Sequence, residues 1–300
     1  MKVRSQASPA SPARAILRAL PIVAIVAGLA ILASFPLSEL YSSWQREGRI
    51  EALSQASTSL SQQDKAELLQ QARSYNEVLA GEPSELDAES VWPYERQLAE
   101  DGPDAEFAYV VIPDIALRMP VYHGASDQVL AVGVGHLEWT SLPVGGPSTH
   151  TVLTAHSGMS DMKAFDDIRN LRPGDVFAVS VLGDLYAYEV TGSEVVLPDE
   201  VQNVAIEPGE DLCTLVTCTP YGVNTHRLLV HAKRTDVPPG FADQAPSPAD
   251  VVLNRRTLPF LGAAAAVAAL CAGLAVRARR RRSRLMRPGG ASAADTGTRG

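Results

Sequence analysis

Two apolar stretches without any charged residue constrain this chain more than any other feature. Residues 19–37 (ALPIVAIVAGLAILASFPL) and residues 258–276 (LPFLGAAAAVAALCAGLAV) are each about as long as a helix that crosses a lipid bilayer. We therefore predict two transmembrane helices, so that neither stretch is available for a water-soluble core.

Basic residues flank each stretch on the side of the nearer chain end. Four precede the first stretch, and seven lie within residues 277–287. Short flanks rich in Lys and Arg remain in the cytoplasm. We expect a two-pass protein of the cell membrane, with residues 1–18 and the basic tail 277–300 inside the cell and the rest outside. The alternatives are a cleaved signal peptide at the first stretch and nucleic-acid binding by the tail.

The chain between the two basic ends is strongly acidic. Residues 19–276 hold 14 basic and 33 acidic residues, a net charge of −19, compared with −8 for the whole chain. This excess of negative charge argues against binding to nucleic acid or to anionic lipid. We expect no nucleic-acid partner.

The first external region, residues 38–104, is predicted to contain two helices that form either a stalk or a cover over the next domain. Ser61 and Asp64 resemble a capping box, apolar residues then recur at helical spacing, and Gly81 is a typical helix stop. The acidic, proline-broken residues 82–104 that follow are expected to be extended.

Residues 105–236 have a different texture, in which short β-rich runs alternate with turn residues. The runs are FAYVVIP, LRMPVYHG, HTVLTAH, VFAVSVLG, LYAYEVTG, EVVLP, LCTLVTC and HRLLVHAK. Strands this short and this closely spaced predict a mostly β domain, an antiparallel barrel or sandwich, with a brief helix over 161–170. Residues 237–257 contain several prolines and are expected to link this domain to the second membrane stretch.

Cys218 is the candidate nucleophile. Cys271 lies in the second membrane stretch, whereas Cys213 and Cys218 are five residues apart on one predicted strand. Their side chains then point to opposite faces, which disfavours a disulfide between them. A thiolate is the reactive form of cysteine, and a nearby cation or imidazole raises its population.

Arg227 is expected to supply a cation near Cys218. If residues 213–218 and 225–232 form a hairpin, the loop 219–224 places Cys218 opposite Thr225. Arg227 then lies on the same face, two residues along, whereas His226 points to the other face. An arginine cannot act as a base, but it can hold a developing oxyanion.

A histidine would have to act as the base. His156 ranks first because it ends the run HTVLTAH, where a strand gives way to a loop. His136 and His123 rank next, and the remaining candidates are His150, His226 and His231. Any of them can equally be an ordinary surface or core residue, so at this point a Cys/His/Arg site is a hypothesis.

We expect neither a metal nor a cofactor. No phosphate-binding loop is present, and no Cys/His spacing suits zinc. The acidic residues Asp166, Asp167, Glu207 and Glu210 raise the alternative of calcium, but they lack EF-hand spacing, and solvated surface charge is the preferred interpretation.

Four stretches resemble the sortase family, most closely its class C or pilin-polymerising branch. In chain order they are IPDIALRMPVYHG (112–124), GVGHLEWTSLPVGG (133–146), HTVLTAHSG (150–158) and TLVTCTPYGVNTHRLLV (214–230). The resemblance covers residues 107–234. Two membrane segments around an external domain also resemble class C enzymes of Gram-positive cells.

The resemblance implies a closed sortase-type β-barrel with short peripheral helices. It also implies that Cys218 is the nucleophile, His156 the catalytic histidine and Arg227 the catalytic arginine of a cysteine transpeptidase. Such enzymes cleave LPxTG-type sorting signals between Thr and Gly through a thioacyl enzyme. In the pilin branch a lysine amine of another pilin subunit takes the acyl group. Thr217, Tyr221 and Asn224 are candidates for the substrate groove or the loop after the nucleophile.

Two segments depart from the family pattern. The family histidine usually has a Gly-His-Arg-Gly-like context, but here the residues are Ala155-His156-Ser157-Gly158. Class C enzymes also tend to have a lid with an Asp-Pro-aromatic motif. Here Asp87 and Trp92 are the candidate lid residues, and an ordinary packed tryptophan is the alternative for Trp92.

Three other functions remain open. A sortase of another class would attach proteins to peptidoglycan, an inactive homologue would only bind sorting peptides, and a cysteine protease would hydrolyse them. LPxTG-type pilins or surface proteins are the expected partners. The small residues of GAAAAVAALCAG in the second membrane stretch are a weak signal of self-association, and the oligomeric state stays open.

Overall fold

The computed structural model describes residues 12–98, 105–158, 164–200, 204–241, 244 and 258–285. Contacts within the chain divide it into two compact units. One contains residues 1–36 and 255–300, and the other contains residues 37–254.

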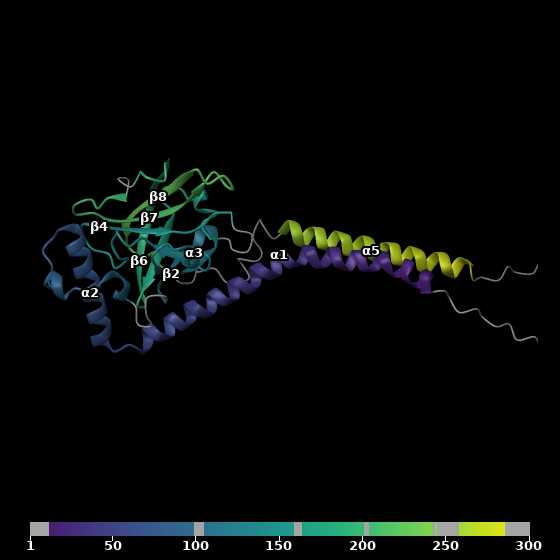
Figure 1. The fold of residues 1–300 in the computed structure, drawn as a ribbon, viewed down its shortest axis with the longest axis horizontal. Coiled ribbons are helices and arrows are strands. Elements are labelled where there is room, and N and C mark those ends of the chain that lie inside the picture. The colour runs from purple at the N-terminus through teal and green to yellow at the C-terminus, as the bar shows by residue number, and fades with distance from the viewer. Residues whose placement is uncertain are drawn as a thin grey trace, which may run out of the picture. The chain divides into compact units, whose positions relative to one another are not determined.

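Both apolar stretches are helical. Residues 19–37 lie within α1 (Pro12–Ser59), and residues 258–276 lie within α5 (Leu258–Leu285) (Figure 1). No helix in the described residues combines the length and the apolarity that a bilayer crossing requires. α1 runs 48 residues without interruption, so the predicted membrane helix and the start of the predicted stalk are one element.

The second helix, α2 (Gln62–Ala80), has the ends that its sequence predicted. At its start the Ser61 hydroxyl accepts the Asp64 N–H (3.1 Å) and lies 2.7 Å from the Asp64 carboxylate. At its end Gly81 adopts the left-handed conformation (φ 72°) that glycine tolerates without a steric cost. Both predicted caps are confirmed.

The segment after α2 is not extended as expected. Residues 82–98 include two 3₁₀ turns, η1 (Ala88–Ser90) and η2 (Tyr94–Arg96), whereas residues 99–104 lie outside the described residues. The reason is hydrogen bonding with α2, because the Gln71 side chain accepts the Trp92 N–H (2.9 Å) and donates to the Ser90 carbonyl (3.4 Å).

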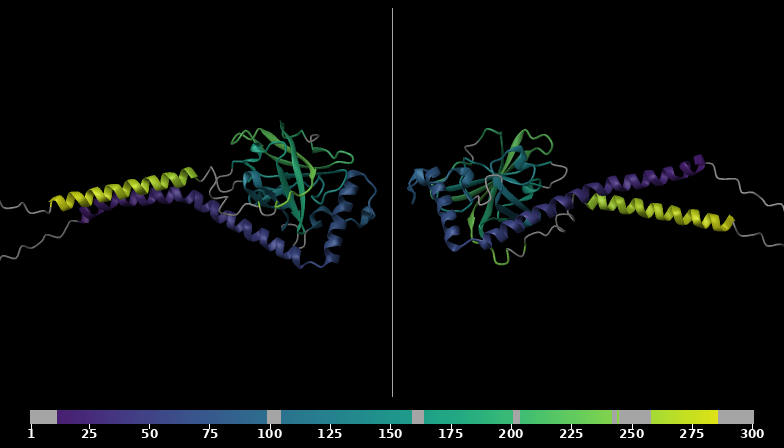
Figure 2. Two further views of the ribbon diagram at one scale, coloured as in Figure 1. Left: turned by 180° about the vertical axis from the view of Figure 1, so that it is seen from behind. Right: turned by 60° about the horizontal axis from the view of Figure 1, so that its bottom comes forward.

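In the described residues, eight strands close into a barrel in the order β1-β2-β3-β4-β7-β8-β6-β5 (Figures 1 and 2). The strands are β1 (Glu106–Ile112), β2 (Leu117–His123), β3 (Val134–His136), β4 (Thr149–Thr154), β5 (Val176–Val181), β6 (Asp184–Val196), β7 (Asp211–Thr219) and β8 (His226–Thr235). Three short elements connect them: η3 (Pro113–Ile115), α3 (Asp127–Leu130) and η4 (Ile168–Asn170). The mostly β barrel with peripheral helices is therefore confirmed.

Three details of the strand prediction were wrong. β2 pairs with β3, and β4 pairs with β7, in parallel, so the barrel is mixed rather than antiparallel. The three-residue β3 was missed. The runs LYAYEVTG and EVVLP form one strand, β6, whose register with β8 shifts between Val190 and Gly192.

The brief helix expected over 161–170 is observed only as η4, and residues 159–163 lie outside the described residues.

The barrel interior is filled by apolar side chains from alternate strand positions, and α2 covers part of the barrel. Leu68 and Ala72 of α2 belong to the same core cluster as the barrel residues Phe107 and Leu215. The buried Asn76 side chain bonds both the N–H (2.7 Å) and the carbonyl (3.0 Å) of Leu142. α2 is therefore an integral layer of the barrel unit, which is the second of the two predicted arrangements.

Candidate functional site

Strand β7 carries two cysteines on opposite faces. Cys213 is completely buried in the barrel core, and this burial raises the pKa of its thiol well above the usual range. Cys218 is half-buried near the end of the strand, and both residues are free thiols. The predicted opposite orientation is confirmed, and it leaves Cys218 as the thiol that an external ligand can reach.

Arg227 lies directly across the hairpin from Cys218. The predicted register was wrong by two residues, because the connecting loop is 220–225 and Cys218 pairs with Arg227 instead of Thr225. A directly opposed pair has its Cβ atoms about 5 Å apart, closer than the diagonal neighbour that we expected. His226 pairs with Thr219 and lies on the other face, as predicted.

The loop after the nucleophile holds the Arg227 side chain at the end of the hairpin. Asn224 has a positive φ of 62°, which asparagine tolerates better than most residues, and its N–H donates to the Pro220 carbonyl (3.0 Å). The Arg227 guanidinium donates to the carbonyls of Asn224 (3.3 Å) and His226 (3.1 Å). The expected loop-shaping position of Asn224 is thus observed.

The parallel pairing of β4 with β7 brings His156 beside Cys218. The last ladder pair is Thr154 with Val216, and the Ala155 N–H continues the ladder by donating to the Val216 carbonyl (3.2 Å). A regular continuation by two residues would set His156 level with Cys218, and the observed bond from the Ser157 hydroxyl to the Cys218 carbonyl (2.7 Å) holds this segment next to the nucleophile. Three remote segments of the chain therefore bring a thiol, an imidazole and a guanidinium to one end of the barrel.

Thr217 and Ser157 tie the His156 segment to β7. The Thr217 hydroxyl donates to the Ala155 carbonyl (2.8 Å), and the Ser157 hydroxyl donates to the Cys218 carbonyl (2.7 Å). Thr217 is buried on the face of β7 opposite to Cys218, so its position does not fit the groove lining that we expected of it. Ser157 was not among the predicted site residues. The sequence signal for it was the serine at a position where the family pattern has an arginine.

Tyr221 lies at the rim of the site. Its ring packs over Gly158, where an added Cβ would be 3.7 Å from two ring atoms, and the Arg169 guanidinium lies 5.6 Å from the ring centroid. The ring is about half exposed (47%). It therefore borders the loop that carries His156 and is available to a ligand.

The two histidines that ranked after His156 are buried away from the thiol. His136 is completely buried, and its ring nitrogens lie 2.8 Å from the Tyr94 hydroxyl and 2.8 Å from the Ser141 carbonyl. His123 packs against Phe107 and Tyr94, and neither of its ring nitrogens makes a hydrogen bond within the described residues. Burial lowers the pKa of each ring to about 4. They are core residues.

His150 and His231 belong to a hydrogen-bonded chain across the outer face of the barrel. The chain runs from the Ala205 carbonyl to His150 (2.8 Å), to the Thr214 hydroxyl (2.7 Å), to His231 (3.0 Å) and to the Glu194 carboxylate (3.0 Å). The Thr214 hydroxyl lies between the two rings and can donate to one ring while it accepts from the other. Burial lowers the pKa of His150.

The candidate lid residues, Asp87 and Trp92, both lie in the segment that follows α2. Trp92 is half-buried against the core cluster, with the Arg96 guanidinium 4.2 Å from its ring centroid. Asp87 is exposed, and its carbonyl accepts the Ser90 N–H (2.7 Å). Trp92 is thus placed as a packed side chain, and a lid role for either residue stays a prediction.

The acidic residues considered for calcium are dispersed. Asp166 is buried and accepts the Gly158 N–H (2.6 Å), whereas Asp167 accepts from the Asn170 side chain (3.3 Å). Glu207 and Glu210 border a cavity of about 580 Å³ on the face that carries His150 and His231. In the described ranges no three His, Cys, Asp or Glu side chains gather as a metal-binding group, and the expected lack of a metal stays a prediction.

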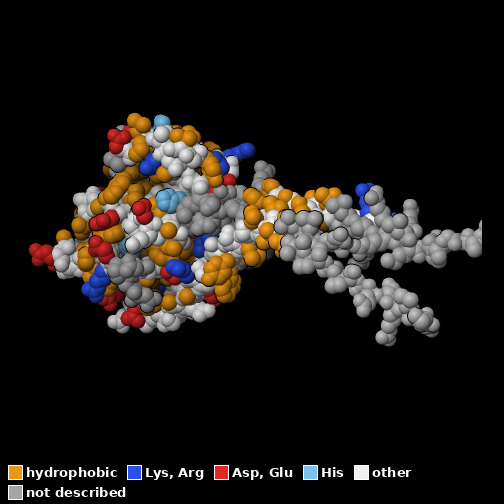
Figure 3. All heavy atoms as spheres, turned by 45° about the vertical axis from the view of Figure 1, so that its right-hand side comes forward, with side chains coloured by type: hydrophobic (Ala, Val, Ile, Leu, Met, Phe, Trp, Pro, Cys, Tyr) orange, Lys and Arg blue, Asp and Glu red, His pale blue; other side chains and the backbone are white. Residues whose placement is uncertain are grey.

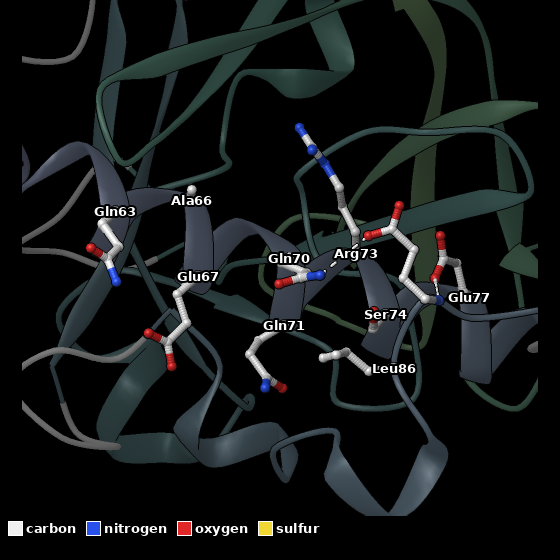
Figure 4. Close-up of a pocket in the computed structure, with 10 residues that line it drawn as sticks. Gln63, Ala66, Glu67, Gln70, Gln71, Arg73, Ser74, Glu77 and Leu86 are labelled. Carbon is white, nitrogen blue, oxygen red and sulfur yellow. Dashed lines mark hydrogen bonds between the residues drawn. The ribbon is translucent and has the colours of Figure 1, made fainter.

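Two other cavities lie along α2, away from the Cys218 end of β7. One, of about 620 Å³, is lined mainly by polar side chains of α2 and by Glu85 and Leu86, with Gln70 donating to Glu85 (3.3 Å) (Figure 4). The other, of about 700 Å³, lies between α2 and residues 144–149. Neither of these two cavities is lined by a cysteine or a histidine.

On the face drawn in Figure 3 the acidic side chains are scattered among apolar and basic ones.

Comparisons with known proteins identify relatives of the barrel. The family model described as the sortase domain matches residues 110–235, within the predicted domain 105–236. Among curated proteins, Sortase A of Streptococcus agalactiae serotype III (strain NEM316) is 27% identical over 128 residues, which is 41% of this chain and 51% of that protein. The chain thus spans about half the length of this curated relative.

Solved structures match more of the chain. Sortase C-1 from Actinomyces oris is 45% identical over 57% of this chain and 99% of its own, with a TM-score of 0.51. Sortase C1 from Streptococcus agalactiae is 36% identical over 64% of this chain and 100% of its own, with a TM-score of 0.59. Sortase C from Clostridium perfringens, solved with the C-terminal cell wall sorting motif, is 38% identical over 63% of this chain and 98% of its own, with a TM-score of 0.56.

Proposed function

The chain belongs to the sortase family, and from this premise we propose that it is a class C cysteine transpeptidase that joins pilin subunits. The observation that carries the proposal is the pairing of Cys218 with Arg227 across the β7–β8 hairpin, with His156 at the end of the adjacent strand β4. These three groups are the ones that an acyl transfer through a thioester requires.

In the first half-reaction the Cys218 thiolate attacks the carbonyl carbon of the threonine in an LPxTG-type sorting signal. Arg227 donates hydrogen bonds to the oxygen that becomes negative in the tetrahedral intermediate. The Thr–Gly bond then breaks, the glycine amine leaves with a proton from the His156 imidazolium, and a thioester on Cys218 remains.

In the second half-reaction the acyl group is transferred from Cys218 to an amine. The lysine amine of another pilin subunit attacks the thioester carbon, and His156 takes the proton that this amine loses. The carbon–sulfur bond breaks, which releases the isopeptide-linked product and restores the Cys218 thiolate and the His156 imidazolium. One imidazole thus acts as the acid in the first step and as the base in the second.

The proposed location is the outer side of the cell membrane, with the barrel outside and both chain ends in the cytoplasm. Two charge-free stretches of 19 residues, 19–37 and 258–276, and the basic residues beyond them support this topology. An enzyme held there would meet exported pilins or surface proteins before they leave the membrane.

A direct test uses the full-length chain in detergent, an LPxTG-type peptide and an amine. We expect a covalent species with the mass of the chain plus the acyl fragment, and its conversion to an amide when a pilin-derived lysine peptide is added. Mass spectrometry follows both steps. A chain that only binds the peptide gives no covalent species, and a protease gives the hydrolysed acid whether or not the amine is present.

A second candidate is a sortase of another class, which transfers the same acyl group to a peptidoglycan precursor. It is favoured by the curated relative and by the two structures from Corynebacterium diphtheriae, which are named Sortase A. The chemistry at Cys218 is the same in both, so the choice depends on the amine. Competition between a lysine peptide and an oligoglycine or diaminopimelate amine distinguishes them.

Replacing Arg227 by alanine is expected to lower the rate of thioacyl-enzyme formation by roughly 100-fold to 1,000-fold, the usual effect of removing one oxyanion donor. Arg227→Lys keeps the charge but loses the planar fork of donors, so we expect an intermediate rate. Single-turnover mass spectrometry measures both rates. Equal rates in the wild type and both variants would show that the oxyanion is held elsewhere.

A further inference from the structure

The strand ladder between β4 and β7 ends just before the proposed catalytic histidine, and two hydroxyl groups replace its next hydrogen bonds. In a regular parallel ladder that includes the bond from the Ala155 N–H to the Val216 carbonyl, the main chain of Ser157 would donate to the Cys218 carbonyl. Here the Ser157 side chain makes that bond instead, at 2.7 Å.

The carbonyl of Ala155 is held in the same manner from the other strand. The Thr217 hydroxyl donates to it at 2.8 Å, from a side chain that is buried and therefore has no competing water. We call Ser157 and Thr217 the hydroxyl clasp. Its two bonds lie at the residues immediately before and after His156.

Because side chains make these bonds, the main chain is free to leave the sheet directly after His156. Gly158 adopts a positive φ of 85°, and its N–H donates to the Asp166 carboxylate (2.6 Å). The His156 carbonyl accepts the Phe165 N–H (3.0 Å). His156 is thus held on one side by β7 and on the other side by the segment that leads into η4.

We propose that Ser157 is a positioning residue that, together with Thr217, holds His156 at the height of Cys218. Ser157 bonds the nucleophile's own carbonyl, so a shift of one strand end moves the other with it. The inference rests on the proposed transpeptidase function, in which His156 exchanges protons at the Cys218 site. It assigns a role to the serine that stands where the family pattern has an arginine.

The loss of the Ser157 hydroxyl removes the bond to β7 that follows His156. The imidazole is then fixed to β7 only through Ala155, and its distance from the thiol is free to vary. A displacement of 1 Å at a reacting group costs up to about 100-fold in rate. We expect at least a tenfold loss for Ser157→Ala, expressed in kcat rather than in KM, because the peptide does not need Ser157 to bind.

The decisive experiment is a double-mutant cycle that needs no sorting peptide. The full-length chain in detergent is treated with iodoacetamide at pH 7, and the alkylation rate of Cys218 is followed by tandem mass spectrometry in the wild type, Ser157→Ala, His156→Ala and the double variant. If Ser157 acts through His156, Ser157→Ala slows alkylation by about tenfold in the wild-type background and by less than twofold in the His156→Ala background.

Matched variants separate positioning from general stability. Thr217→Val removes the other hydroxyl of the clasp at nearly constant volume and is expected to behave like Ser157→Ala. Thr151→Val is the control, because the Thr151 hydroxyl is buried on β4 and also donates to a carbonyl at 2.8 Å, that of Ser141. The control is expected to leave the alkylation rate within twofold, and Ser157→Thr, which keeps a hydroxyl, is expected to restore it.

Two outcomes would overturn the inference. One is an unchanged alkylation rate in Ser157→Ala, and the other is an equal loss in both histidine backgrounds, which would mean that Ser157 acts independently of His156. A chain that forms no thioacyl species with any sorting peptide would contradict the proposed function, but it would leave this peptide-free cycle readable.

Discussion

Cys218→Ala is expected to abolish thioacyl formation and transpeptidation, with a loss of at least about 1,000-fold, because no other atom of the site can form the thioester. Cys213→Ala is the matched control. Both cysteines lie on β7 five residues apart, but Cys213 faces the core, where burial raises the pKa of its thiol. This control is expected to keep the activity and to lose some stability from the small cavity that it creates.

A thiol-reactive probe provides the independent measurement for this pair. In the native chain it is expected to label Cys218 and to spare Cys213, whereas after unfolding it labels both. If Cys213→Ala also lost the thioacyl species while its thermal unfolding remained native-like, the assignment of the nucleophile to Cys218 alone would be wrong.

The face of each site residue on the hairpin could be predicted from the sequence, although the register could not. Side chains alternate between the two faces along a strand. Cys218 and Arg227 therefore share a face both in the predicted register and in the observed register, which differ by two residues. The register itself depends on the loop between the strands. Gly222 (φ 75°) and Asn224 (φ 62°) both adopt positive φ there, and the sequence only indicated a turn.

The place of His156 depended on a contact that local sequence does not encode. Strands β4 and β7 pair in parallel although more than 50 residues separate them, and no turn or periodicity between them indicates that they are neighbours. From spacing alone, His136 and His123 therefore remained alternatives. The resemblance to the sortase family selected His156, and the barrel topology supplies the physical reason.

The helical part shows the same division between local and long-range information. Ser61 and Gly81 signalled the ends of α2 correctly, because caps are formed by residues close in sequence. The burial of α2 against the barrel depends on Asn76 and Leu142, 66 residues apart, so the sequence left open whether the helix forms a stalk or covers the barrel. Residues 82–98 were expected to be extended for the same reason, since Gln71 holds them from a distance.

Acidification from pH 7.5 to pH 4.5 is expected to destabilise the barrel mainly through two buried histidines, with a contribution in the same direction from His150. His123 and His136 ordinarily titrate near pH 6.5, and burial lowers the pKa of each to about 4 in the folded chain. Between these two values the unfolded state binds more protons than the folded state, so the free energy of unfolding falls as the pH falls. The loss begins below about pH 6.5 and levels off below about pH 4.

The magnitude follows from the difference in proton affinity. A tenfold difference corresponds to about 1.4 kcal/mol, so each ring costs on the order of 2–3 kcal/mol at pH 4.5, a large share of a typical domain's stability. Asp114 and Asp211 act in the opposite direction, because burial raises the pKa of their carboxyl groups and the folded state then gains protons. Their effect is common to every variant compared.

His123→Phe isolates one of the two rings. Neither nitrogen of His123 makes a hydrogen bond within the described residues, and its ring packs against Phe107 (centroids 4.4 Å apart) and Tyr94 (4.9 Å), so an apolar ring of similar shape should be accepted. We expect this variant to lose less stability than the wild type between pH 7.5 and pH 4.5, with His136 and His150 accounting for the loss that remains. His226→Phe, at a half-buried ring that bonds Thr225 and lies outside the core, is the control for replacing a histidine by phenylalanine.

Thermal unfolding of the full-length chain in detergent, followed by near-ultraviolet circular dichroism, measures this loss of stability between pH 7.5 and pH 4.5. The measurement compares the wild type with the two variants. The hydrogen bonds of Tyr94 explain why protonation of a buried histidine destabilises more than one strand. The Tyr94 hydroxyl bonds His136 and accepts the Gly124 N–H (3.0 Å), so a charge on His136 disturbs the contact that fastens residues 82–98 to the barrel. Identical pH profiles for the wild type and His123→Phe would show that the acid sensitivity arises in other groups.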